Sequence, residues 1–340
     1  MGWRGRFRRR QFRRYWRYRA PANGRGRYRA PAPHAVPVVD AAQLPPATDD
    51  VARSRLGLGA FAQPWPGSVS VTDDVTGASV ATLGRVAAIG ELTAGLTAGG
   101  MFCWDGVNAV ELILYAGHLS SRADDDVLAG ANRLAVETDT GLWEVIGFGT
   151  ATLTAPQSYR LTRLLRGQMG SDFAMGASSA GNRVVVLDGA ASLMPVPSEW
   201  LGATVELRSF AGPSDGVGEV SDMALGLDPV LPPAPVHLRA LRAPGGSDIA
   251  LSWVRRSRAD TDSWAPDDAP LDCVPEAYRL SIYNGLTQVR AIDLTAPTAA
   301  YTTAQQTADF GAPPSSFIFT VAQTSPLYGQ GHASTGSFTA

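Results

Sequence analysis

The 340-residue sequence contains no lysine, so each of its 29 basic residues is an arginine. It has two cysteines, Cys103 and Cys273, which are too few and too far apart for a disulfide framework or a cysteine-based metal site. Its four histidines are scattered, and no pair has metal-ligand spacing. No apolar run approaches the ~20 residues needed to span a membrane. We therefore expect no metal site and no membrane span.

The sequence also lacks the short motifs of common enzymes. It has no Gly-x-Ser-x-Gly elbow, no phosphate-binding glycine loop and no dinucleotide fingerprint. Its clustered carboxylates, such as residues 73–74, 124–126 and 267–268, lie in predicted loops, where we interpret them as solvated side chains. A carbohydrate hydrolase needs two convergent carboxylates, and their spacing does not indicate such a pair. We expect no catalytic residue and no cofactor, and we expect the protein not to be an enzyme.

Charge is distributed very unevenly along the chain. Residues 1–30 hold 12 arginines and no acidic residue, whereas the rest holds the other 17 basic residues and all 31 acidic ones, a net charge of −14. Aromatic residues alternate with these arginines and aliphatic ones are nearly absent, so the segment cannot form a packed core alone. We predict an extended Arg-rich arm, followed by an Ala/Pro-rich linker, over residues 1–49. The residues expected to make its contacts are Arg8, Arg9, Arg10, Arg13, Arg14, Trp16, Arg17 and Arg19.

The composition of this arm fits three partners. Arginines could bind phosphates while aromatics stack on bases, which would make it a nucleic-acid-binding segment. It could bind anionic lipid or lipopolysaccharide. It could also be an assembly arm that lies on an acidic neighbouring subunit, which is the alternative we favour over nucleic acid.

Beyond the arm, glycine and proline recur at short intervals, which favours many short strands over long helices. We predict a β-rich domain over residues 50–231, with a short helix or turn at 49–56, a hairpin at 143–153 and an acidic loop around Asp215, Glu219 and Asp222. The Pro-Pro-Ala-Pro run at 232–235 marks a boundary. Alternating apolar residues then predict a fibronectin type III-like sandwich over 232–340, with Trp253 pointing into the core opposite Tyr278. The fold class is thus mainly β.

One arginine-bearing strand, residues 159–170, lies at the centre of the predicted β-rich domain. It reads Tyr-Arg-Leu-Thr-Arg-Leu-Leu-Arg-Gly-Gln-Met-Gly, and we expect the chain to turn at Gly167 and Gly170. We interpret Arg160, Arg163 and Arg166 as bridging carbonyls or acids rather than binding a substrate.

Several motifs share one order with a known family. They include residues 60–67 (AFAQPWPG), 89–92 (IGEL), 143–146 (WEVI), 164–168 (LLRGQ), 186–190 (VLDGA), 251–258 (LSWVRRSR), 262–264 (DSW) and 301–306 (YTTAQQ). Together they resemble the C-terminal part of the baseplate megatron, or host specificity tail-tip protein, of gene transfer agents and related siphophages. Members of that family are usually several times longer, so the chain looks like the distal part of a split tail-tip protein with an added basic arm.

The resemblance implies a structural virion protein at the tail tip or baseplate, near the host-contacting end. It implies a homotrimer whose partners are other tail-tip proteins, such as the hub and the distal tail protein. A second hypothesis is a glycan- or lipopolysaccharide-binding adhesin that uses a sandwich loop with Asp260, Asp262 and Trp264. A third is a nucleic-acid-binding protein that acts through the basic arm.

Overall fold

The computed structural model describes residues 37–47, 50, 52–242, 245–259 and 269–340. The described chain is mainly β, which confirms the predicted fold class, and its helices are short. The helices are α2 (Asp124–Leu128), α3 (Thr303–Phe310) and the 3-10 turns η1 (Asp172–Ala174), η2 (Ser198–Trp200) and η3 (Asp228–Val230).

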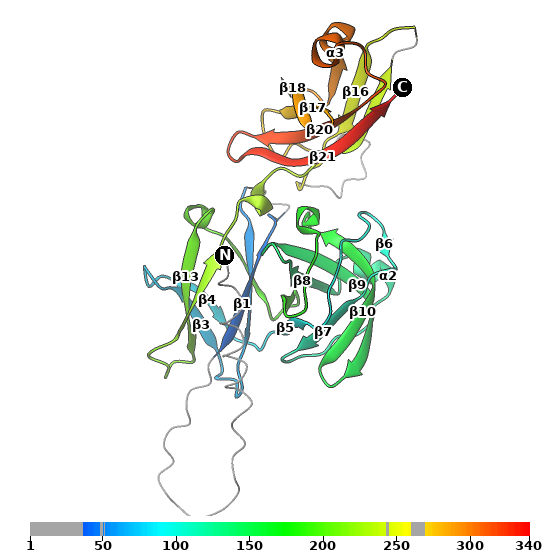
Figure 1. Cartoon of the computed structure of the whole chain (residues 1–340). Helices are drawn as coiled ribbons and strands as arrows, with labels where there is room; N and C mark the ends of the chain where they lie inside the picture. The colour runs from blue at the N-terminus through cyan, green and yellow to red at the C-terminus, as the bar shows by residue number, and fades with distance from the viewer. Residues whose placement is uncertain (1–36, 48–49, 51, 243–244, 260–268) are drawn as a thin grey trace, which may run out of the picture. The chain divides into compact units, whose positions relative to one another are not determined.

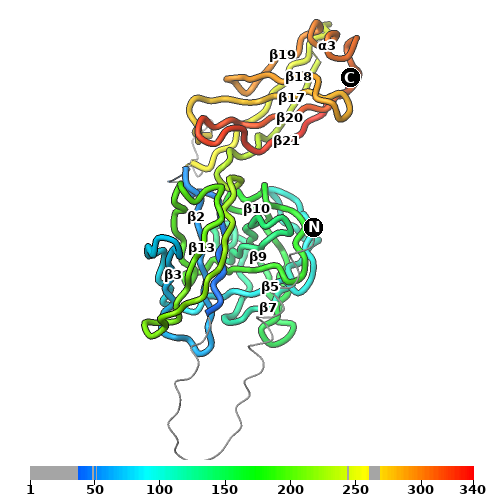
Figure 2. Tube along the Cα trace, turned by 60° about the vertical axis from the view of Figure 1, so that its left-hand side comes forward, coloured from blue at the N-terminus to red at the C-terminus, as the bar shows by residue number. Residues whose placement is uncertain are grey.

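Seven strands of the region 89–186 form one sheet that closes on itself. They are β5 (Ile89–Leu92), β6 (Trp104–Asp105), β7 (Val110–Leu114), β8 (Arg133–Glu137), β9 (Trp143–Ala155), β10 (Ser158–Gln168) and β11 (Arg183–Val186). Their order is β6-β10-β7-β5-β11-β8-β9, and β9 also pairs with β10, which closes the sheet into a barrel. Figures 1 and 2 show β9 and β10 running side by side. The interior is filled by aliphatic and aromatic side chains, among them Leu112, Ile146 and Leu161.

A three-stranded sheet, made of β1 (Val38–Leu44), β2 (Arg55–Phe61) and β12 (Ser192–Pro195), contributes to two neighbouring cores. Leu56 and Leu58 pack with residues of a four-stranded sheet built from β14 (Glu219–Ala224), β13 (Thr204–Ala211), β3 (Val69–Asp73) and β4 (Ser79–Leu83). Ala42 and Leu44 pack instead with side chains of the barrel strands. This shared use explains why the inner residues of β2 are buried without the usual alternation.

The C-terminal region forms two antiparallel sheets. One has the order β15 (Val236–Arg242), β16 (Ile249–Val254), β19 (Thr298–Tyr301), and the other has the order β18 (Thr287–Leu294), β17 (Tyr278–Asn284), β20 (Ser316–Ser325), β21 (Gly329–Thr339). This arrangement is that of a fibronectin type III-like sandwich. Trp253 and Tyr278 are both buried and meet edge to face, with ring centroids 5.3 Å apart, so the predicted core pair is confirmed.

Three sequence-based predictions for the first two thirds of the chain were wrong or only partly right. Residues 38–44, expected in a linker, form strand β1, because Ala42 and Leu44 find apolar partners on the barrel. The expected helix or turn at 49–56 is a turn at residues 52–53, but its last two residues belong to β2, which begins at Arg55. The acidic loop around residues 215–222 contains strand β14, whose exposed residues are paired with β13.

The predicted hairpin at 143–153 is also wrong, because β9 is one continuous strand of 13 residues. Its first seven residues are buried and the rest are mostly exposed. In the sequence, this change from buried to exposed residues resembles a turn between two strands. In the sandwich, the sequence analysis missed β19, β21 and α3. The last of these has a capping box at its start, formed by Thr302 and Gln305, and a left-handed Gly311 at its end.

Candidate functional site

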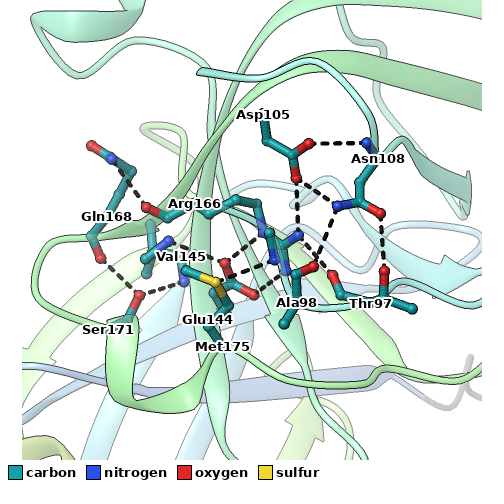
Figure 3. Close-up of polar contacts among 12 residues, drawn as sticks. Thr97, Ala98, Asp105, Asn108, Glu144, Val145, Arg166, Gln168, Ser171 and Met175 are labelled. Atoms are coloured by element: carbon teal, nitrogen blue, oxygen red, sulfur yellow. Dashed lines mark hydrogen bonds and ion pairs between the residues drawn. The ribbon is translucent and has the colours of Figure 1, made fainter. Parts of the chain in front are cut away.

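A densely connected polar group is centred on Arg166 in β10, inside the run Leu-Leu-Arg-Gly-Gln (Figure 3). Its Nε donates to Oε1 of Glu144, and its second terminal nitrogen, Nη2, donates to Oε2, both at 2.7 Å. Nη1 donates to the carbonyl oxygen of Thr97 at 2.8 Å and lies 3.4 Å from Oδ2 of Asp105. The Arg166 and Glu144 side chains are 0% and 1% exposed, so this ion pair is buried.

A bulge in β10 explains how an arginine comes to point inward. Leu164 and Leu165 are both buried, so the alternation of the strand breaks just before Arg166. The register between β9 and β10 shifts between Leu165 and Gln168, and such a bulge redirects the side chain beside it. Gly167 has φ of +60°, and a Cβ there would lie 2.8 Å from the Cα of Asp172. The position therefore favours glycine, and the backbone N–H of Gly167 donates to Glu144 at 3.0 Å.

Asp105 links Arg166 to the loop that follows β6. Its Oδ1 accepts from the backbone N–H groups of Val107 and Asn108, each at 3.0 Å, and its Oδ2 accepts from the Asn108 amide at 2.7 Å. Burial alone would raise the pKa of Asp105. The Asn108 and Val107 hydrogen bonds and the charge of Arg166 outweigh it, so the pKa lies below the ordinary aspartate value.

These contacts hold residues 97–108 at both ends. Arg166 binds the carbonyl of Thr97 at one end and Asp105 near the other, and the hydroxyl of Thr97 donates to Asn108 at 3.0 Å. Between these anchors the loop exposes apolar side chains: Met101 is 52% exposed, Phe102 71% and Val107 93%. We call Met101, Phe102 and Val107 the apolar loop tip. A buried polar cluster thus supports a loop whose outer side chains lack apolar cover.

The Arg166 cluster is built to hold structure rather than to react. Each of the three guanidinium nitrogens already has a partner, and both carboxylate oxygens of Glu144 accept hydrogen bonds from Arg166 or Gly167. None of these side chains lines the two clefts around Arg255, Arg256 and Arg258 in the described part of the chain. A general acid or base must reach a substrate, and these groups face one another instead.

The other two arginines of β10 also contact acids. Arg160 lies 3.4 Å from Glu111, and Arg163 donates two hydrogen bonds to Asp124 while its guanidinium lies over the ring of Trp104 at 4.6 Å. The prediction that all three arginines bridge acids or carbonyls is confirmed. One neighbouring expectation was wrong: Asp73 is not a solvated loop acid but is nearly buried, where it accepts from the backbone of Val75 and Thr76.

The residues predicted to make the chain's external contacts lie outside the described ranges. These are Arg8, Arg9, Arg10, Arg13, Arg14, Trp16, Arg17 and Arg19 of the arm, and Asp260, Asp262 and Trp264 of the sandwich loop. Sequence reasoning missed Glu144 and Asp105 as the partners of Arg166. An acid inside the apolar run Trp-Glu-Val-Ile was the available signal, since a core-facing carboxylate needs a cation nearby.

Two further observations concern the described residues as a whole. They contain no group of three or more His, Cys, Asp or Glu side chains placed to hold a metal ion. Among the helices of the described ranges, none combines the length and apolar character needed to cross a membrane.

Comparison with known proteins gives a match to one sequence family and weak structural similarity to solved proteins. No curated protein matches the chain. A "Cytokine receptor complex - Crystal form 1A" structure has 15% identity and a TM-score of 0.24, covering 68% of this chain and 90% of its own. The "Human OSCAR ligand-binding domain" has 13% identity and a TM-score of 0.22, covering 69% and 90%. Neither likeness is close enough to bear on fold or function. Residues 87–185 match the family described as "Rcc01698-like, C-terminal".

Proposed function

We propose that the chain is a structural component of the tail tip or baseplate of a phage or gene transfer agent, placed near the host-contacting end. The observation that carries the proposal is the match of residues 87–185 to the Rcc01698-like family, a name associated with gene transfer agents. The matched segment coincides with the closed barrel from β5 to β11, which contains the Arg166 cluster. The match therefore covers a complete structural unit.

The ordered motifs extend this support beyond the matched segment. They continue into the sandwich, where the run Leu-Ser-Trp-Val-Arg-Arg-Ser-Arg begins in β16 and supplies the core residue Trp253. The resemblance to the tail-tip family thus involves residues of two separate cores. A protein that shared only a common sandwich architecture would not be expected to share these motifs in this order.

The chemistry of the barrel also suits an assembly role. The charged groups of the Arg166 cluster make internal contacts, whereas the apolar loop tip is exposed on a loop held at both ends. A rigid loop that presents apolar side chains loses little conformational entropy when it is buried against another protein. We propose that the apolar loop tip contacts a neighbouring tail subunit.

The proposal includes the partners of the chain. Following the family resemblance, three copies surround the tail axis and contact the hub and the distal tail protein. The arginines of residues 1–30 then bind acidic surfaces of neighbouring tail proteins, because guanidinium groups make planar, multi-donor contacts with carboxylates. Host attachment through a surface glycan is part of this proposal, since the tail tip is where a particle meets the cell.

Particles made with a truncated chain test the assembly role. We would replace the natural gene by one that encodes a chain without residues 1–36, which leaves β1 intact, and separately by one carrying Arg-to-Lys changes at positions 8, 9, 10, 13 and 14. The proposal predicts that the truncated chain is missing from purified particles, whereas the lysine variant, which keeps the charge, is retained in reduced amount. Full-length chain that never co-purifies with particles would contradict the tail-tip role itself.

A further inference from the structure

Strand β14 forms an open edge of its four-stranded sheet, since its only strand neighbour among the described residues is β13. Leu225, which follows β14, donates its N–H to Ala203 and accepts from the N–H of Gly202, so both of its backbone groups point toward the β13 side. The direction of these groups alternates along a strand. The exposed residues whose backbone N–H and C=O groups point away from β13 are therefore Val220, Asp222 and Ala224. Another extended chain can pair with these groups.

Two carboxylates face each other on the outer surface of this sheet. Glu206 on β13 lies directly opposite Asp222 on β14, and both are exposed. The alternation makes them a non-hydrogen-bonded pair, in which the side chains lie closest, and like charges placed opposite each other destabilise a sheet. Arg208, on the same face of β13, is already engaged by Asp74 and the carbonyl of Val217. A positive charge from elsewhere, placed beside Asp222, would offset the repulsion.

The charge of this edge decides which strand can pair with it. Glu219 begins β14 and Asp222 lies near its other end, so pairing with the same edge of another copy would bring four carboxylates together. Such self-pairing is unfavourable. An extended strand that carries arginines would instead be attracted to the edge and would pair with its backbone.

The arm contains a segment with this pattern. Residues 25–29 read Arg-Gly-Arg-Tyr-Arg, with an arginine at every second position, and residues 1–30 contain no acid. Side chains two positions apart share one face of a strand, so in a paired strand the three arginines would line one face. A five-residue segment also matches the length of β14, which has six residues.

We propose that residues 25–29 of one copy add as a strand to the free edge of β14 in a second copy, with an arginine beside Asp222. This contact rests on the three-copy assembly proposed above, and it names the acidic surface to which the arm binds. Each copy supplies one arm and one edge. Three copies can therefore close a ring in which every arm and every edge is used.

Photo-cross-linking between full chains tests the contact. A chain carrying Tyr28→p-benzoylphenylalanine is mixed in urea with nitrogen-15-labelled natural chain, and the two are refolded together and irradiated. Mass spectrometry then distinguishes the copies, because only the acceptor chain is labelled. The cross-linked peptides are expected to join the unlabelled arm to labelled residues 219–224.

Variants of the labelled chain test the role of charge. Glu219→Gln combined with Asp222→Asn is expected to lower the yield of this cross-link by about fivefold, since two exposed ion pairs are lost. The matched control combines Asp125→Asn with Asp126→Asn, which removes the same charge from exposed positions on α2. This control is expected to change the yield by less than about twofold.

A proline variant tests backbone pairing separately from charge. Val220→Pro removes an N–H that points away from β13, and proline is tolerated on an edge strand at such a position. It is expected to lower the yield by about fivefold, because the added strand loses a hydrogen bond and meets the proline ring. Val220→Thr keeps the N–H and is expected to leave the yield unchanged.

Three outcomes would overturn the proposal. Cross-links confined to unlabelled peptides would place the arm on its own chain, and cross-links outside residues 219–224 would place it on another surface. Equal losses in the two charge variants would reduce the contact to general attraction. A full yield with Val220→Pro would exclude strand addition. Incorporation of the natural chain into particles is measured independently, so failure of this contact is distinguishable from failure of the tail-tip proposal.

Discussion

Arg166 and Glu144 face each other across β10 and β9 through two parallel hydrogen bonds of 2.7 Å, and both side chains are almost fully removed from solvent. This bidentate geometry is the strongest form of an arginine–carboxylate contact. Both partners lie within residues 87–185, which match the Rcc01698-like family, in the motifs at residues 143–146 and 164–168. The pair therefore explains in physical terms why two distant motifs belong together.

Breaking this pair should be far more costly than breaking an exposed one. Glu144→Gln removes the charge that compensates Arg166, and we expect the free energy of unfolding to fall by about 3–5 kcal/mol. The matched control is Glu111→Gln, which breaks the exposed contact with Arg160 and should cost less than about 1 kcal/mol. Urea unfolding followed by tryptophan fluorescence measures both. Equal losses in the two variants would contradict the assigned role of the buried pair.

Asp105 should make the stability of the barrel sensitive to acid. Its pKa is lower in the folded chain than the ordinary aspartate value of about 3.9. The ionised Asp105 side chain therefore adds its full contribution to the free energy of unfolding above the ordinary pKa. This contribution is lost as the pH falls through the lower pKa of the folded chain. The stability difference between the natural chain and Asp105→Asn should be constant from about pH 5 to 7 and shrink below about pH 4. Asp125→Asn, at an exposed position on α2, serves as the control. If the stability difference between the natural chain and Asp105→Asn grew as the pH fell, the lowered pKa of Asp105 would be contradicted.

Gly90 should tolerate no side chain. It lies in β5, where a Cβ would come 2.0 Å from the carbonyl oxygen of Ile113, a backbone atom of the paired strand β7. Gly90→Ala must therefore push β5 and β7 apart, and we expect a loss of at least about 3 kcal/mol or failure to fold. Gly84→Ala, where nothing lies within 4 Å of the added carbon, should change stability by less than about 1 kcal/mol. Thermal unfolding of both variants measures the contrast.

The apolar loop tip should matter for assembly and not for folding. Met101→Ser and Val107→Ser remove exposed apolar surface while leaving the anchors at Thr97 and Asp105 in place. We expect the double variant to unfold within about 0.5 kcal/mol of the natural chain. Its incorporation into particles, measured by quantitative mass spectrometry, should drop several-fold. Leu153→Ser, at an exposed position on β9 outside this loop, is the control. If the double variant were incorporated into particles as well as the natural chain, the proposed contact of the apolar loop tip with a neighbouring subunit would be contradicted.

Periodicity was sufficient to predict the sandwich, because strands such as β16 alternate regularly between buried and exposed residues. It failed for β1 and β2, whose inner residues are buried in two cores at once and so show no alternation. It also failed for β9, where a change from buried to exposed residues within one strand resembled a turn. Burial on a second face depends on tertiary partners that a local pattern does not encode.

The candidate site was predictable only in part. The contacts of the β10 arginines with acids and a carbonyl were predicted from their place on a strand at the centre of a structural domain. The buried orientation of Arg166 was not, because it depends on a bulge and on Gly167 at positive φ.

The most direct test of the tail-tip proposal is a cryo-electron microscopy map of the end of the tail in intact particles. The proposal predicts that the closed barrel and the sandwich can be fitted at the tip in three copies around the tail axis. It also predicts continuous density from residues 1–36 onto a neighbouring tail protein. A complete map of the tail tip that accommodates neither unit, or that places the chain at the head or along the tail tube, would contradict it.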